Sequence, residues 1–220
     1  MRYNQKNYNQ IYHEGKNSHK SNIPLSVFAE IYSRLNKAFG ENTVVIGGRA
    51  INLLCYNETR FTHDIDVVVP TNPSEYSERL IEEKFSIKRD GRKIVGATDM
   101  EDTSIEPLTL DFYYARPING IEISEILKNV KEIDVADTKV LVPKPAIMLM
   151  LKYDAGRPKD VRDFDLLLGN FYGGKIESLF EKEKTLFDEL LEKHKTDGKK
   201  LNKLLVEYYY YEQTKSQLRK

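Results

Sequence analysis

The sequence is poor in cysteine, in long apolar runs and in net charge, and each absence excludes a class of protein. One cysteine in 220 residues, Cys55, rules out an internal disulfide framework. Because there is neither a signal peptide nor an apolar run long enough to span a membrane, we expect a cytoplasmic protein with no membrane partner. Basic and acidic residues balance at 34 each, which argues against a broad basic nucleic-acid surface but permits a local basic groove.

The length fits one domain, or a compact core with a helical appendage. We expect a flexible N-terminal arm over residues 1–22, because this stretch is polar and has no apolar period. An α+β core would occupy residues 23–142, and a C-terminal helical region residues 143–220.

Within that core, the stretch from Val44 to Leu54 predicts a strand, a glycine turn and a helix. Val44–Ile46 is short, apolar and β-branched, which suits a buried strand. Gly47 and Gly48 end it, and good helix formers follow from Ala50. Such a turn lets the backbone approach a ligand closely, and free N–H groups at the helix start attract an anion such as phosphate.

A second β-branched run carries two carboxylates, Asp64 and Asp66. On a strand these side chains point to one face, whereas Ile65 and Val67 point to the other. Two neighbouring carboxylates repel each other unless a cation lies between them. Oxygen ligands of this kind suit Mg²⁺, which commonly binds one or two carboxylates together with substrate phosphates.

Together these residues resemble a known signature. Gly47-Gly48, a helix-length gap and then Asp64-x-Asp66 resemble the polymerase-β-type nucleotidyltransferase superfamily. The fuller phrase Arg60-x-Thr62-x-Asp64 is similar to minimal nucleotidyltransferases, especially the abortive-infection (AbiEii-type) toxins. The resemblance implies a mixed β-sheet flanked by helices, an NTP substrate and two Mg²⁺ ions bridged by the paired carboxylates.

Asp111 is a lone charge inside the apolar, aromatic segment Leu108–Tyr114. Its burial would cost free energy without a partner, so it is either a solvent-facing residue at a strand edge or a third metal ligand. The resemblance favours the ligand, because the family carries a third carboxylate on a neighbouring strand. In that role Asp111 would complete the metal site and accept the proton of the attacking hydroxyl.

Phosphate contacts are expected from the glycine turn and its surroundings. Backbone N–H groups at Gly48 and Arg49 would hold the β and γ phosphates. Arg49 stands where many relatives have a small residue, and its side chain would either fold onto the phosphates or crowd the cradle. Arg60 and Thr62 are expected to support the site or to contact the nucleotide; the alternative for Thr62 is a buried residue packed against the strand.

The segment from Lys152 to Asp163 resembles a Lys-x-x-Ala-x-Arg-x-Lys-Asp phrase of the abortive-infection group. We expect Lys152 and Lys159 near the triphosphate, with Asp160 and Asp163 holding a lysine or arginine in place. The alternative is an exposed helix–turn–helix whose charges cap the helices.

Periodicity and turn signals predict the remaining elements. They comprise two hairpins, 85–88 with 93–96 and 130–135 with 139–142, and helices from Pro24 to Gly40, Pro73 to Lys84, Pro145 to Tyr153, Pro158 onward, Ile176 to His194 and Leu201 to Gln213. Helical spacing places Ile81 on the inner face of the helix from Pro73 and Val161 on the inner face of the helix from Pro158.

The hypothesis that follows is Mg²⁺-dependent transfer of NMP from an NTP to an acceptor hydroxyl, with release of pyrophosphate. The acceptor would be tRNA or another RNA end, as in a toxin–antitoxin system; a protein or a small molecule is the alternative. A third alternative is a nucleotide-binding or antitoxin-like protein without turnover. The resemblance also implies a small helical partner protein, and the aromatic run Tyr208–Tyr211 indicates either bundle packing or a homodimer contact, with base stacking as the alternative.

Overall fold

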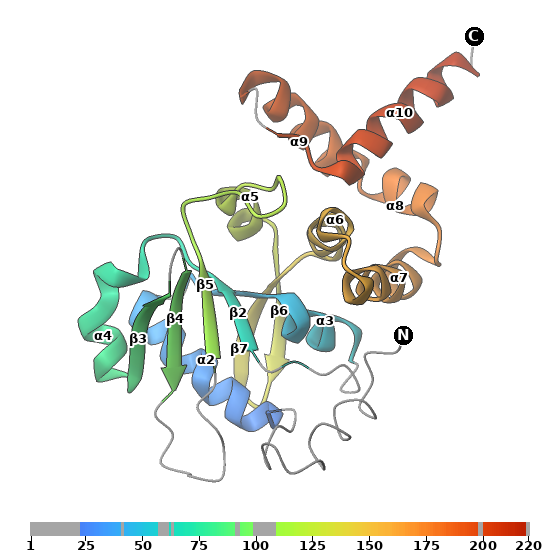
Figure 1. The fold of residues 1–220 in the computed structure, drawn as a ribbon. Helices are drawn as coiled ribbons and strands as arrows, with labels where there is room; N and C mark the ends of the chain where they lie inside the picture. Colours follow the sequence, from blue (N-terminus) through green and yellow to red (C-terminus); the bar gives the residue numbers. More distant parts are fainter. Residues whose placement is uncertain are drawn as a thin grey trace. The chain divides into compact units, whose positions relative to one another are not determined.

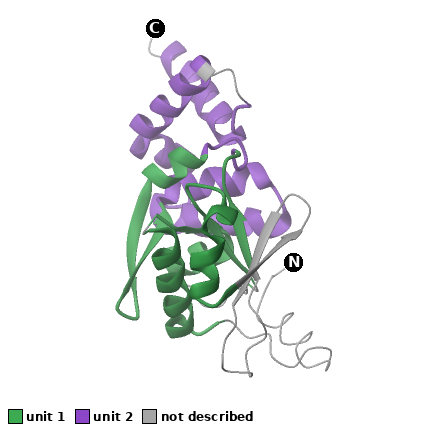
Figure 2. Ribbon diagram, turned by 90° about the vertical axis from the view of Figure 1, so that its left-hand side faces the viewer, with its two compact units in different colours: residues 1–116, 123–143 green, residues 117–122, 144–220 purple. Residues whose placement is uncertain are grey.

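The structure, a computed structural model, describes residues 23–40, 42–56, 62, 64–90, 93–98, 109–197 and 200–218. The predicted arm over residues 1–22 and the predicted site residue Arg60 therefore lie outside the described residues. The chain divides into two compact units, coloured separately in Figure 2. The first unit comprises the described residues up to Arg116 together with Ile123–Pro143, and the second comprises Pro117–Glu122 and the residues from Lys144 onward.

A mixed sheet forms the centre of the first unit (Figure 1), which confirms the predicted α+β fold. Strands β1 with β7 and β2 with β5 are parallel, and the other neighbouring pairs are antiparallel. Both predicted hairpins are confirmed, as β3 with β4 and β6 with β7. Within the described residues the sheet has seven strands in the order β3-β4-β5-β2-β1-β7-β6, namely β1 (Val44–Ile46), β2 (Asp64–Val68), β3 (Phe85–Asp90), β4 (Lys93–Thr98), β5 (Thr109–Tyr113), β6 (Val130–Val135) and β7 (Thr138–Pro143).

Helices of the first unit pack on this sheet. Helix α2 contacts β6, β7 and α4, whereas α3 contacts β1, β2 and β7. Helix α3 begins at the first glycine of the diglycine, earlier than predicted, and α5 was not predicted at all. These helices are α2 (Leu25–Phe39), α3 (Gly47–Cys55), the 3-10 turn η1 (Pro73–Tyr76), α4 (Ser77–Glu82) and α5 (Ile123–Lys128).

A buried tyrosine joins α2 to two strands of the sheet. The Tyr32 side chain is fully buried, and its hydroxyl donates to the Thr43 carbonyl oxygen at 2.7 Å. The same hydroxyl accepts from the Leu141 amide at 2.8 Å. Because Thr43 precedes β1 and Leu141 lies in β7, this one group satisfies backbone atoms of both strands and holds α2 in register with them.

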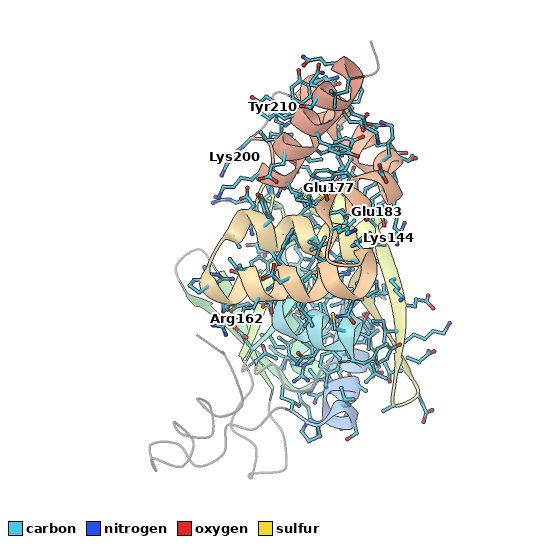
Figure 3. All side chains as sticks on the ribbon, turned by 90° about the vertical axis from the view of Figure 1, so that its right-hand side faces the viewer. Lys144, Arg162, Glu177, Glu183, Lys200 and Tyr210 are labelled. Atoms are coloured by element: carbon cyan, nitrogen blue, oxygen red, sulfur yellow. The ribbon has the colours of Figure 1, made fainter. Side chains whose placement is uncertain are left out.

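The second unit is helical. Gly156 ends α6 and separates it from α7. Elsewhere in the second unit, the aromatic rings of Phe180, Phe187 and Tyr208 pack together, with their centroids 5.0–5.5 Å apart. Tyr208 thus packs inside the bundle, while Tyr210 on α10 is 64% exposed (Figure 3). The helices are α6 (Pro145–Ala155), α7 (Pro158–Tyr172), α8 (Ile176–Lys182), α9 (Lys184–Asp197) and α10 (Lys203–Gln217).

Three details of the predicted helices are wrong. The helix predicted from Ile176 to His194 is interrupted at Glu183, which separates α8 from α9. Ile81 and Val161, both expected on inner faces, are 66% and 50% exposed. For Ile81 and Val161, periodicity located the helix correctly but did not decide which side of it the rest of the fold would cover.

Across the described ranges, no helix combines the length and the apolar character needed to cross a membrane.

Candidate active site

Three carboxylates converge where β2 and β5 lie side by side. The two strands are parallel, and their register pairs Asp66 with Asp111. Side chains alternate along a strand, so Asp64, Asp66 and Asp111 share one face of the sheet. All three are half-buried, and each offers an oxygen within 4.8 Å of the others'. The strand pairing therefore brings Asp111 next to Asp64 and Asp66, although it is more than 40 residues away in the sequence.

The first glycine of the diglycine turn lies against this cluster. Gly47 has φ +66°, a backbone conformation that favours glycine, and it follows Ile46, the register partner of Asp66. A Cβ atom at this position would overlap Asp66 Oδ2 and would lie 2.8 Å from Asp66 Cγ. Glycine is thus required here for two separate reasons, the positive φ and the close approach of a carboxylate.

Hydroxyl groups contact two of the three carboxylates. Thr62 is buried, and its Oγ1 lies 3.0 Å from Asp64 Oδ1 and 3.0 Å from the Asp64 carbonyl oxygen. Thr62 is therefore buried, as the alternative expected, and its hydroxyl also contacts Asp64. Whether Thr62 also contacts a nucleotide stays a prediction.

Tyr113 also belongs to this site, although it was not among the residues predicted from the sequence. Its hydroxyl donates to Asp66 Oδ1 at 3.1 Å. Burial raises the pKa of this phenol, and the nearby charge of Asp66 raises it further, so the group remains a donor at neutral pH. Strand alternation from Asp111 could have indicated Tyr113, which lies two residues further along β5 on the same face.

Arg49, the first residue after the diglycine, is buried in the first unit. Its guanidinium lies over the Phe28 ring, 5.1 Å from the ring centroid. It also borders a cavity of about 340 Å³ that Asn52 and Asp134 help to line. The predicted contact between Arg49 and phosphate stays a prediction.

In the second unit, Lys152 belongs to a buried charge cluster. Its Nζ lies 3.1 Å from Asp160 Oδ1 and 2.8 Å from Asp163 Oδ2, and all three side chains are at most 6% exposed. Arg157 also pairs with Asp160. Asp160 and Asp163 therefore hold Lys152 and Arg157 in place, as expected. The helix–turn–helix of the alternative is present as α6 and α7, but the charges of Lys152, Asp160 and Asp163 are buried within it and not exposed. Lys159 is half-buried in the first turn of α7, and the phosphate contacts of Lys152 and Lys159 stay predictions.

The donor set of the carboxylate cluster fits a hard divalent cation. Asp64, Asp66 and Asp111 provide only oxygen atoms as ligands, in a half-buried setting. Mg²⁺ prefers such ligands, whereas sites for softer metals use nitrogen or sulfur.

The sequence matches a protein family over residues 31–218, and that family is described as "Nucleotidyl transferase AbiEii toxin, Type IV TA system". The chain belongs to this family. The resemblance noted from Gly47, Gly48, Asp64 and Asp66 is thereby confirmed, and the protein is a nucleotidyltransferase. No curated protein matches the sequence.

Several solved structures resemble this AbiEii-type nucleotidyltransferase at low identity. The antibiotic-resistance factor ANT(2'')-Ia is 18% identical, covers 79% of this chain and 100% of its own, and gives a TM-score of 0.49. An antigenic nucleotidyltransferase-like protein from Paracoccidioides brasiliensis is 16% identical, covers 76% of this chain and 89% of its own, and gives a TM-score of 0.45. JHP933 from Helicobacter pylori is 16% identical, covers 90% of this chain and 98% of its own, and gives a TM-score of 0.47.

Proposed function

We propose that this nucleotidyltransferase uses Mg²⁺ to transfer NMP from an NTP to an acceptor hydroxyl. The observation that carries the proposal is the convergence of Asp64, Asp66 and Asp111, whose oxygens lie within 4.8 Å of one another beside Gly47. A non-catalytic nucleotide-binding protein would not need all three acidic groups, so their presence favours turnover.

Asp64 and Asp66 would hold Mg²⁺, and Asp111 would complete the site on the adjacent strand. When bound, the cation neutralises charge on the triphosphate, which is the main requirement of nucleotidyl transfer. The residues of the chain then position the reactants: the acceptor oxygen bonds to the α-phosphorus, the α–β phosphoanhydride bond breaks, and pyrophosphate leaves. The Asp111 carboxylate would accept the proton of the attacking hydroxyl.

Backbone N–H groups at the start of α3 would bind the β and γ phosphates. The first turn of a helix leaves N–H groups without partners in the helix, and the helix dipole favours an anion there. Helix α3 starts at Gly47, and Gly47 lies against Asp66, so the first amides of the helix are close to the acidic cluster. This arrangement would bring the triphosphate and the acidic cluster together.

The acceptor that we propose is the hydroxyl of an RNA end, with tRNA as the first candidate. NTPs and RNA ends are both present in the cytoplasm, where we place the activity. A protein or small-molecule hydroxyl is the alternative acceptor. A small helical partner protein or a second copy of the chain would then control the enzyme.

The direct test incubates the protein with each labelled NTP, Mg²⁺ and total tRNA. We expect label in RNA from wild type and none from Asp64→Ala. Equal results from the two proteins, with no label transferred, would refute the proposal. Mass spectrometry of the RNA and of accompanying proteins then identifies the acceptor, and label found only on protein would replace RNA with the alternative.

A further inference from the structure

Tyr113 and Asp66 come from different strands and meet beside the acidic cluster. Tyr113 lies in β5, and its register partner in β2 is Val68, two residues beyond Asp66. Its ring therefore leans diagonally across the strand pair, and the hydroxyl reaches Asp66 Oδ1 at 3.1 Å. A phenylalanine would supply the same ring to the sheet, so the hydroxyl adds only the contact to the carboxylate.

The Asp66 side chain is constrained at both of its oxygens. Tyr113 donates to Oδ1, and Oδ2 occupies the space that a side chain on Gly47 would fill. Rotation of the carboxyl group would break the first contact or bring an oxygen against the Gly47 backbone. Both constraints act in the first unit and need no ligand to be present.

Such a constraint matters because three carboxylates lie close together. Like charges at these separations repel, and without restraint the side chains would turn away from one another. A donor on one carboxylate oxygen offsets part of that repulsion and selects one rotamer. Groups that orient metal ligands in this way typically change metal affinity by about 10–100-fold when they are removed.

We infer that Tyr113 is a positioning residue, whose hydroxyl holds the Asp66 carboxylate in the orientation that binds the metal. This role rests on the proposed function, since it assumes that the acidic cluster is a metal site. Tyr113 acts through Asp66 and needs no contact of its own with substrate.

The test compares Tyr113→Phe with a matched control, Tyr172→Phe. The Tyr172 hydroxyl also donates to a carboxylate, Glu183 Oε1 at 2.8 Å, but it lies in the second unit. Both substitutions thus remove one oxygen atom and one hydrogen bond to an acid. Thermal unfolding of each variant is recorded first, and both are expected to remain folded because the ring is kept.

Isothermal titration of the full chain with Mn²⁺ alone then measures metal affinity without reference to activity. We expect the dissociation constant to rise about 10–100-fold in Tyr113→Phe and to stay at the wild-type value in Tyr172→Phe. In the transfer assay, Tyr113→Phe should need more Mg²⁺ for half-maximal rate and should regain most of its rate at saturating metal.

Equal Mn²⁺ affinity in wild type and Tyr113→Phe would overturn the positioning role while leaving the proposed function intact. The same decrease in affinity in both variants would also overturn it, because the effect would then be one of general stability. Failure of wild type itself to bind Mn²⁺ would instead remove the metal site and with it the proposed mechanism.

Discussion

Gly47 and Asp66 approach each other so closely that a side chain at position 47 would overlap the carboxylate. Gly47 begins α3 directly after β1 ends, and a Cβ added there would lie 2.8 Å from Cγ of Asp66 in β2. The diglycine segment and the acidic cluster are therefore packed against each other, so a change in one displaces the other.

Gly47→Ala should abolish transfer. The new methyl group must displace Asp66, and the φ of +66° adds strain of about 1–3 kcal/mol. The control is Gly173→Ala, because Gly173 has φ +63° but no atom within 4 Å of an added Cβ. Urea unfolding should show a loss of stability in both variants, whereas only Gly47→Ala should lose Mn²⁺ binding. Normal Mn²⁺ affinity in Gly47→Ala would contradict the close approach.

Asp111→Asn should slow transfer by about 10²–10⁴-fold, since it removes a ligand and the proposed proton acceptor together. The melting temperature without metal should be unchanged or higher, because one of three mutually repelling charges is lost. Asp165→Asn provides the control, since Asp165 is exposed on α7. Labelled-NTP transfer and thermal unfolding measure the two effects. A variant as active as wild type would remove Asp111 from the mechanism.

Lys152→Met should destabilise the protein by about 3–5 kcal/mol, because two buried carboxylates would lose their shared cation. Lys139→Met serves as the comparison: Lys139 pairs with Glu132 at 3.0 Å, but both side chains are largely exposed. We expect no measurable change there. Urea unfolding gives both values. Similar small effects in the two variants would show that the Lys152 cluster contributes little to stability.

Stability should fall in acid partly through Asp160. Burial acts to raise the pKa of this carboxyl, but hydrogen bonds and charges from Arg157 and Lys152 outweigh burial and hold the pKa below its ordinary value. A group with a depressed folded-state pKa stabilises the fold above its unfolded pKa of about 3.9, and this stabilisation disappears as pH falls through the folded value.

The check is urea unfolding between pH 5 and pH 2.5, roughly the range over which a depressed aspartate titrates. Wild type should lose more stability across this interval than Asp160→Asn, which has no charge to protonate at that position. Parallel curves for the two proteins would show that Asp160 has the same pKa in both states.

Much of the core of the site could be predicted because its signals are local. The alternation of Asp64, Ile65 and Asp66 places two carboxylates on one face of any strand, and a diglycine between apolar segments marks a turn. Asp111 was recognisable because a charge inside an apolar strand needs a reason. The first two inferences depend only on residues within a few positions of one another, whereas the resemblance to a known family favoured the ligand role of Asp111.

Other features depend on which elements pack together, and local periodicity carries no such information. Helix α7 has Val161 on one side and Asp160 with Asp163 on another; periodicity favoured burial of the valine, and the fold buries the acids instead. The reason is that Lys152 on α6 supplies a cation at that face. A buried charge is tolerated only where its partner is also buried.

The sequence by itself determined the acidic pair, the glycine turn, the mixed sheet and the membership in a nucleotidyltransferase family. Only the tertiary structure decided that Tyr113 reaches Asp66, that Arg49 lies over Phe28 and that Lys152 is buried between two acids. The physical reason is the range of the interactions. Backbone geometry sets the first group within single elements, whereas the second arises when strands and helices distant in the sequence come into contact.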